Sequence, residues 1–409
     1  MNPEQLLKKA ETYQDRLVET RRYFHQHPET EFNVTETKLY VKKELSSIGY
    51  EPQDCGRAGV VVTVGGKKPG KTFLIRGDMD ALPIKEESDV EFLSKNGNMH
   101  ACGHDIHTTM LLGAARLLKE HEDEINGTVK LMFQPAEEIF EGAKDMIDSG
   151  VLKNPDVDAA LMIHVVAAMP FPAGTVIVCD GGVSAPGADF FRIKVQGKGC
   201  HGSMPNMGVD PINAAAHIII ALQEIHAREL SLADDAVLTI GSINGGQAPN
   251  IIPDTIEMTG SIRTYDEEIR KYIKERMTEI SKNIAKTFRA KAEVTFDRGC
   301  PVLLNNSDLS KDAAMYTKEL LGQSKAFTQS ELLTMTASTG KAVKSSGSED
   351  FAYVSQQVPS IMLSLAAGEP EKGYIYPQHH PKVKFDESVL SIGSAIYAYN
   401  AIKWLDEHR

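Results

Sequence analysis

The pattern of hydrophobic and polar positions in the first half of the chain alternates between a helical and a strand-like period. Apolar residues recur with the spacing of amphipathic helices over 4–24 and 35–48. Short apolar runs of the length of a buried strand follow, with helical segments such as Thr108–Lys119 between them. These runs are Val60–Val64, Phe73–Ile75, Val129–Phe133 and Ala159–Val166. Strands that alternate with helices predict an α/β fold with a mostly parallel central sheet.

Residues 186–297 have a different hydrophobic pattern, in which alternating strand-like segments flank two longer helical segments. The predicted order βαββαβ is that of a ferredoxin-like α+β unit. Its predicted elements are strand 188–196, helix 211–228, strand 236–243, strand 254–264, helix 266–288 and strand 290–297. Because strand and helix patterns resume afterwards, we expect an inserted domain at 186–297. It would interrupt a discontinuous first domain made of residues 1–185 and 298–409.

Length and composition narrow the class of protein. A chain of 409 residues is too long for one ordinary core, which agrees with two domains. The net charge of −12 argues against nucleic-acid and acidic-membrane partners. The five cysteines are odd in number and widely scattered, which is typical of a reducing compartment. The first residues lack the apolar core of a signal peptide, and no run approaches ~20 apolar residues, so we expect a cytoplasmic protein.

The densest chemistry lies at 99–109, where Met-His-Ala-Cys-Gly-His-Asp-Ile-His-Thr-Thr collects a thiol, three imidazoles and a carboxylate. No helix or strand needs such a run for packing. Thiolate, imidazole and carboxylate together suit a zinc-like divalent ion. Acidic side chains also follow the predicted strands, namely Asp78 and Asp80 after one and Glu137 and Glu138 after another. Since the carboxyl ends of parallel strands share one edge of a sheet, we expect these groups to converge on one cleft.

Each candidate also has a structural interpretation when it is taken alone. Cys102 and His104 are compatible with a buried cysteine beside a helix-capping loop, and His164 with a satisfied core histidine on an apolar strand. Glutamates such as Glu138 end many ordinary strands, and His379 is a weak signal by itself. Together, however, these five residues supply more nitrogen, sulfur and oxygen ligands than one tetrahedral ion with an open position needs. The set therefore favours a pair of metal ions.

The chain resembles the M20 metallopeptidase family, and within it the amidohydrolase branch of hippurate hydrolases, N-acyl-amino-acid amidohydrolases and auxin-conjugate hydrolases. Eight short segments carry the resemblance, in family order and across nearly the whole chain. They are RRYFHQHPETE (Arg21–Glu31), RGDMDALP (Arg76–Pro83), MHACGHDIHT (Met99–Thr108), FQPAEE (Phe133–Glu138), GKGCHGSMP (Gly197–Pro205), NIIP (Asn250–Pro253), GSEDF (Gly347–Phe351) and HHPKVKFDE (His379–Glu387).

The resemblance implies a metal-dependent exopeptidase-like catalytic domain with two divalent ions per subunit, zinc or manganese first and cobalt or nickel next. It implies that Glu137 is the general base and that Asp80 orients a ligand or this base. The family motif His-x-Pro selects His379 over His380 as the last ligand. The implied metal ligands are Cys102, His104, Glu138, His164 and His379.

The resemblance also gives the inserted domain a role as a lid and dimerisation domain in a homodimer. It implies that His201 donates to the tetrahedral oxyanion, a role often filled from the partner subunit. Asn250 and Arg263 match positions that bind the substrate carboxylate, and an arginine fork suits that geometry. Without the resemblance, His201 reads as a surface loop histidine and Arg263 as half of a surface ion pair.

The resulting hypothesis is a two-metal amidohydrolase that hydrolyses the amide bond of small N-acyl amino acids to a carboxylic acid and an amino acid. A dipeptidase or an N-acetyl-diaminopimelate deacetylase of the same fold is the alternative within enzymes. A non-catalytic metal-binding or sensing protein is the alternative outside them. Such a protein would be expected to lose the free acid or a ligand first, whereas this chain retains Glu137 and all five ligands.

Overall fold

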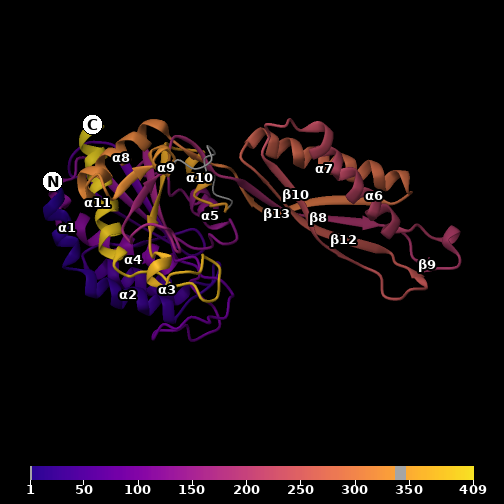
Figure 1. The fold of residues 1–409 in the computed structure, drawn as a ribbon, viewed down its shortest axis with the longest axis horizontal. Helices are drawn as coiled ribbons and strands as arrows, with labels where there is room; N and C mark the ends of the chain where they lie inside the picture. The colour runs from indigo at the N-terminus through magenta and orange to yellow at the C-terminus, as the bar shows by residue number, and fades with distance from the viewer. Residues whose placement is uncertain (1, 337–346) are drawn as a thin grey trace. The chain divides into compact units, whose positions relative to one another are not determined.

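A computed structural model describes residues 2–336 and 347–409, which form two compact units (Figure 1). The first unit comprises residues 2–184, 304–336 and 350–409. The second comprises Ala185–Leu303 and the short segment 347–349. Residues 185, 298–303 and 347–349 therefore belong to the second unit and not, as expected, to the first. The reason for 298–303 is that strand β13 (Lys291–Cys300) continues beyond residue 297.

The first unit is built on an eight-stranded mixed sheet with the order β1-β2-β4-β3-β5-β16-β6-β15. Strands β4, β3, β5 and β16 form a parallel block, and the pairs β1–β2, β2–β4 and β16–β6 are antiparallel. This sheet confirms the predicted α/β fold with a mostly parallel centre. The strands are β1 (Gln53–Cys55), β2 (Gly59–Gly65), β3 (Thr72–Asp78), β4 (Thr128–Gln134), β5 (Ala159–Val166), β6 (Val176–Val178), β15 (Ala326–Thr328) and β16 (Ser360–Ala366).

Helices pack against this sheet, with α4 and α11 both in contact with β3. The helical stretch predicted at 4–24 is two helices, because the chain turns at Thr12, whose hydroxyl donates to the Lys9 carbonyl (2.6 Å). The helices of the unit are α1 (Pro3–Glu11), α2 (Gln14–Gln26), α3 (Thr35–Ser47), α4 (His104–Glu120), α5 (Gly142–Asp148), α8 (Ser307–Leu321), α9 (Gln329–Thr336), α10 (Ala352–Ser355) and α11 (Val389–Glu407).

Helix α4 begins at His104, four residues before the predicted start at Thr108. Gly103, whose φ of 97° favours glycine, leads the chain into the first turn. Nearly every residue of α4 is buried, so the period that predicts a surface helix is weak at its start. As a result, His104 stands on the first turn of a helix fixed in the core.

The parallel strands place their carboxyl ends at one edge of the sheet. β3 is buried over its full length, including the charged residues Arg76 and Asp78. Asp78 is paired with Gln134 at the end of β4, and His164 of β5 with Ser364 of β16. The polar residues that follow these strands therefore start from adjacent positions, as the sequence predicts.

The second unit has the predicted βαββαβ order in a four-stranded antiparallel sheet, β10-β12-β8-β13. Helices α6 and α7 cover one face of this sheet and share a separate apolar core with it. Helix α6 ends at Glu224 and continues as a single π-helical turn, Ile225–Glu229. The elements are β8 (Gly187–Gln196), α6 (Pro211–Glu224), β10 (Ala236–Asn244), β12 (Thr255–Thr264), α7 (Glu267–Thr287) and β13.

Shorter elements complete the fold. Two small sheets pair β11 with β9 and β14 with β7. Their strands are β7 (Gly182–Ala185), β9 (Cys200–His201), β11 (Ile251–Ile252) and β14 (Leu303–Asn305), and the 3-10 turns are Glu122–Glu124, Pro205–Met207 and Pro370–Lys372. None of the helices in the described residues combines the length and the apolar character needed to cross a membrane.

Candidate metal centre

The structure brings the five predicted metal ligands together in the first unit. Ligand atoms of Cys102, His104 and His164 lie within 4.8 Å of one another, and so do those of Cys102, Glu138 and His379. The two groups of three share the thiol of Cys102. Residues that are far apart in the sequence thus form one cluster beyond the carboxyl ends of β3, β4 and β5.

Backbone carbonyls fix the orientation of two of the histidine rings. The Nδ1 atom of His104 lies 2.8 Å from the carbonyl oxygen of Asp80, and that of His164 lies 2.7 Å from the carbonyl oxygen of Val165. A carbonyl only accepts, so each Nδ1 carries the proton in these contacts. Both rings therefore direct Nε2 into the cluster, which is how proteins commonly prepare a histidine for a metal.

Asp80 holds the main chain of Glu137 and Glu138 in place through hydrogen bonds. Its Oδ1 accepts the backbone N–H of Glu137 (2.9 Å), and its Oδ2 accepts that of Glu138 (3.2 Å). The turn before them places Ala136 in the left-handed region, at φ 57°. The carboxyl groups of both glutamates then lie near His104, whose Nε2 is 3.9 Å from Glu137 Oε2 and 3.8 Å from Glu138 Oε1.

His379 completes the cluster from a loop. Its Nε2 lies 3.6 Å from Glu138 Oε1, and its backbone N–H donates to the carbonyl of Ala101 (2.9 Å). The side chain of His379 is 53% exposed, whereas that of His104 is almost fully buried. The cluster is therefore open to solvent on the side of His379.

The atoms of this cluster fit a divalent cation. His104 Nε2 and Glu138 Oε1 are buried and have no hydrogen-bond partner among the described residues. The distance from Cys102 Sγ to His164 Nε2 is 3.6 Å. Donor atoms bonded to one tetrahedral zinc ion at about 2.0–2.3 Å lie roughly 3.3–3.8 Å apart. The separations thus match a set of ligands around a metal.

The electrostatics of the cluster also favour a cation. Burial, with Glu138 nearby, raises the pKa of the Cys102 thiol well above its ordinary value. Burial and the neighbouring Asp80 and Asp78 raise the pKa of Glu138, against the opposing effect of His104. Burial and His107 lower the pKa of His164 to about 3. A buried thiolate and carboxylate are costly unless a positive charge compensates them, and a divalent ion supplies it.

A second group, made of Asp78, His104 and His107, has ligand atoms within 4.8 Å of one another. Asp78 and His107 are already engaged in hydrogen bonds, however. Asp78 Oδ2 accepts from Arg76 (2.6 Å), and Asp78 Oδ1 lies 2.6 Å from His107 Nδ1. His107 Nε2 accepts the N–H of Val165 (2.9 Å). The ring of His107 therefore has no nitrogen left for a metal.

No role was predicted from the sequence for Arg76, Asp350 or Gln378, which lie close to these residues. Arg76 and Asp350 form a buried pair (2.9 Å), and Gln378 donates to the carbonyl of Val165 (2.8 Å). Arg76 and Asp350 lie in the segments RGDMDALP and GSEDF, so those motifs were the available signal. Gln378 directly precedes the matching segment that starts at His379.

The remaining predicted residues, His201, Asn250 and Arg263, lie in the second unit. The short β9–β11 ladder brings the first two close, since the Gly202 N–H donates to the Asn250 carbonyl (2.8 Å). Arg263 stands on β12, and its Nη1 donates to Ser348 Oγ (2.7 Å). No carboxylate of the described residues lies within 4.0 Å of its guanidinium nitrogens, so the alternative interpretation of Arg263 as half of a surface ion pair finds no partner there.

A buried charge cluster supports the site from α2. His25 Nδ1 lies 2.8 Å from Asp105 Oδ2, and its Nε2 lies 3.0 Å from Glu86 Oε1. Arg21 pairs with the same Asp105 oxygen (2.8 Å), and Phe92 packs against His25. Burial and Arg21 disfavour the charged imidazole, but hydrogen bonds to Asp105 and Glu86 outweigh them and raise the pKa of His25.

The raised pKa of His25 predicts how stability depends on pH. Stabilisation by its charged ring is complete below the ordinary value of about 6.5 and is lost as the pH rises through the raised pKa. In metal-free protein, we expect the free energy of unfolding to fall above neutral pH more steeply than in His25→Gln. Urea titrations between pH 6 and 9 measure this, with His217→Gln, on an exposed face of α6, as the control. Parallel pH profiles for the parent and His25→Gln would contradict the assignment.

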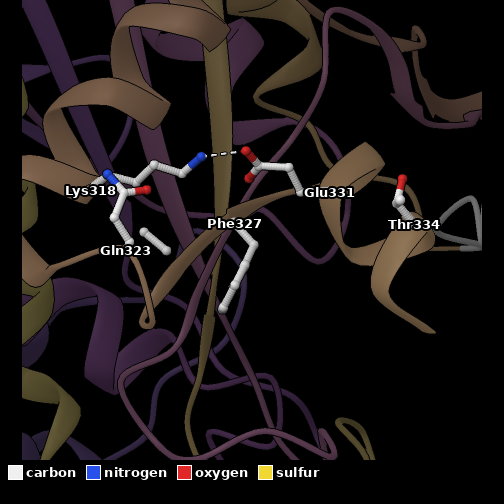
Figure 2. A pocket seen from close by; sticks show the side chains of 6 residues that line it. Lys318, Gln323, Phe327, Glu331 and Thr334 are labelled. Carbon is white, nitrogen blue, oxygen red and sulfur yellow. Dashed lines mark hydrogen bonds and ion pairs between the residues drawn. The ribbon is translucent and has the colours of Figure 1, made fainter.

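One pocket of the first unit lies apart from these residues. It has a volume of 380 Å³ and is lined by Lys318, Gln323, Ala326, Phe327, Glu331 and Thr334. Figure 2 shows the ion pair between Lys318 and Glu331 across it (2.5 Å). None of the predicted ligands or catalytic residues lines this pocket, so it does not enter the functional argument.

Comparison with known proteins places these features in one family. The model of peptidase family M20/M25/M40 matches residues 74–403. Thermostable carboxypeptidase 2 of Saccharolobus solfataricus is 37% identical over 407 residues, covering 98% of each chain. N-acetyl-L-cysteine deacetylase of Bacillus subtilis is 35% identical over 399 residues, covering 96% of this chain and 89% of the relative. The crystal structure of a dinuclear metal-binding M20 peptidase from Bacillus subtilis has a TM-score of 0.77 and 32% identity, covering 97% of this chain and 99% of that one.

Proposed function

The chain belongs to peptidase family M20/M25/M40, and we propose that it hydrolyses the amide bond of N-acyl amino acids with two divalent metal ions. Membership confirms the predicted family and the predicted class of enzyme, a metal-dependent amidohydrolase. One observation carries the proposal of a metal pair. Five donor atoms form two groups of three that share Cys102, and two of these atoms, His104 Nε2 and Glu138 Oε1, are buried with no hydrogen-bond partner in the described part of the chain.

We assign the metal ions to Cys102, His104, Glu138, His164 and His379. A thiolate among nitrogen and oxygen ligands favours a borderline-soft ion, so zinc and manganese come first, with cobalt and nickel next. One M20 relative of known structure is a dinuclear metal-binding peptidase, which supports two ions per chain.

Glu137 is the proposed general base and acid. When bound, the ions would polarise the scissile carbonyl and lower the pKa of water. Glu137 takes a proton from the attacking water and delivers it to the nitrogen of the leaving amine. Asp80 holds the backbone of both glutamates, which supports a site where two adjacent carboxylates lie beside His104.

Three residues of the second unit have a proposed role with the substrate. His201 donates to the developing oxyanion, and Asn250 and Arg263 bind the carboxylate of the amino acid. The half-buried guanidinium of Arg263 has no carboxylate of the described residues beside it, which supports an anionic ligand.

We also propose that the second unit mediates a homodimer. Large apolar side chains are exposed on and near α6 and the β9–β11 ladder, where a partner would cover them. They are Met204, Met207, Ile212, Ile220 and Ile251. The five cysteines are all free thiols, which supports the proposed cytoplasmic location.

The relatives support a substrate with a free carboxylate. A carboxypeptidase and an N-acetyl-L-cysteine deacetylase both cleave an amide whose nitrogen belongs to an amino acid with a free carboxyl group. They differ in what lies on the acyl side, a peptide in one and an acetyl group in the other. We therefore propose that the amino-acid side is the common element and that the acyl group varies.

A reconstitution assay tests the proposed function. Protein stripped with a chelator is reloaded with zinc, manganese or cobalt and given N-acetyl amino acids, hippurate, their carboxamide analogues and unblocked dipeptides. We expect metal-dependent release of free amino acid from the N-acyl substrates and little from the carboxamides. Preference for a free amino terminus would favour the dipeptidase alternative, and the absence of any turnover would contradict the proposal.

A further inference from the structure

The main chain of Val165 connects three segments that carry the metal-ligand cluster. Its N–H donates to Nε2 of His107 on α4 (2.9 Å). Its carbonyl accepts from Nδ1 of His164 (2.7 Å) and from Nε2 of Gln378 (2.8 Å). The main chain of Val165, near the end of β5, is thus hydrogen-bonded to the rings of His164 and His107. It is also hydrogen-bonded to Gln378, the residue before the proposed ligand His379.

His107 is held rigidly for this contact. Because its Nε2 accepts an N–H, the ring is neutral and its proton sits on Nδ1, which donates to Asp78 Oδ1 (2.6 Å). Asp78 is in turn fixed by Arg76, and all three side chains are fully buried. Both nitrogens of His107 are therefore in use, and besides its hydrogen bond with Val165 the ring packs edge-on against the ring of His164, with the two centroids 4.7 Å apart.

Gln378 holds the loop that carries His379 through a hydrogen bond to the Val165 carbonyl. It directly precedes His379, which has a φ of 65° and an exposed side chain. A non-glycine residue in this region is held there only by its surroundings. Three hydrogen bonds hold this turn: the Gln378 side chain donates to the Val165 carbonyl, the His379 N–H to the Ala101 carbonyl (2.9 Å) and the His380 N–H to the Pro377 carbonyl (3.3 Å).

We propose that His107 and Gln378 are positioning residues for metal binding, which set the His164 ring and the His379 loop through their contacts with the N–H and the carbonyl of Val165. This inference rests on the proposed metal site. The lone pair of His164 Nε2 points into the cluster only while its Nδ1–H stays on the Val165 carbonyl. If the hydrogen bond of Val165 with His107 or with Gln378 is lost, the Val165 carbonyl can move, so His164 and His379 are held less firmly in the geometry that binds metal.

The test is metal affinity, measured by chelator competition and by the visible absorption of bound cobalt. Gln378→Met removes the donor and preserves the shape of the side chain. His107→Asn keeps a partner for Asp78 but loses the acceptor for the Val165 N–H, whereas His107→Gln retains an acceptor near that position. We expect Gln378→Met and His107→Asn to weaken binding about 10- to 100-fold and to change the cobalt spectrum, with partial rescue in His107→Gln.

Matched controls separate positioning from general stability. Gln223→Met removes an exposed glutamine that also donates to a backbone carbonyl, and His217→Gln replaces an exposed histidine of the same helix α6. Both controls should bind metal as the parent does. The thermal midpoint of metal-free Gln378→Met should stay near that of the parent, because this half-buried side chain lies on a loop.

The double variant gives the sharpest readout. Since His107 and Gln378 both contact the main chain of Val165, Gln378→Met with His107→Asn should lose less affinity than the product of the two single losses. Parent-like affinity in both single variants would overturn the inference and leave the metal site intact. Strictly multiplicative losses would also overturn it. A parent protein that binds no divalent ion would overturn the proposed function as well.

Discussion

Replacing Glu137 by glutamine is expected to lower kcat for N-acyl amino acids about 10²- to 10⁴-fold, the range that a general base contributes. The amide cannot take the proton of the attacking water or return it to the leaving nitrogen. The donors that we assign to the metal ions are untouched, so the variant should still bind two ions per chain. Steady-state kinetics and metal analysis of the same preparation measure both quantities.

The control is Glu141→Gln, which changes a partly exposed glutamate four residues along that pairs with Arg57. Its turnover and metal content should match those of the parent. Turnover retained in Glu137→Gln would refute the general-base role. Loss of metal together with activity would instead place Glu137 among the ligands, where its distance of 3.9 Å from His104 Nε2 leaves it close enough to matter.

Replacing Arg76 by methionine is expected to lower the free energy of unfolding by about 3–5 kcal/mol, because it leaves buried carboxylates without their cation. Arg76 is 1% exposed, and its guanidinium donates to Asp78 (2.6 Å), to Asp350 (2.9 Å) and to Gln134 (2.9 Å). Methionine fills much of the volume but compensates neither charge. Urea unfolding of the metal-free protein measures the loss without a contribution from bound ions.

Arg57→Met is the matched control, since Arg57 also pairs with two carboxylates but is 56% exposed. Surface pairs of this kind contribute about 0–1 kcal/mol. Similar losses in the two variants would show that burial of the Arg76 pair carries no special cost. A large loss in Arg76→Met alone would support the view that this pair fixes the ends of β3 and β4 beneath the metal ligands.

The sequence predicted the strands at the centre of the first unit well because most of their residues are buried. Val60–Val64 and Ala159–Val166 stand out as apolar runs, and they form β2 and β5 almost as expected. The start of α4 was missed, because a helix buried on all sides loses the period that marks its boundary. The break at Thr12 was missed because polar residues at a turn leave the apolar spacing intact.

The set of metal ligands could be proposed from residue types and motif order, but the hydrogen bonds that orient these ligands could not. The contacts of His104 and His164 with carbonyl oxygens leave no trace in the sequence, because every residue has a carbonyl. The hydrogen bonds of the Val165 main chain with His107 and Gln378 leave no trace in the sequence either. Such contacts depend on which backbone groups the fold brings together, and only the structure supplies that.

The most direct test of the account is anomalous diffraction from crystals of the protein loaded with zinc or manganese. The account predicts two ions per chain, both within bonding distance of donors from Cys102, His104, Glu138, His164 and His379, with Glu137 outside the ligand set. A single ion, or ions ligated by Asp78 and His107, would contradict it.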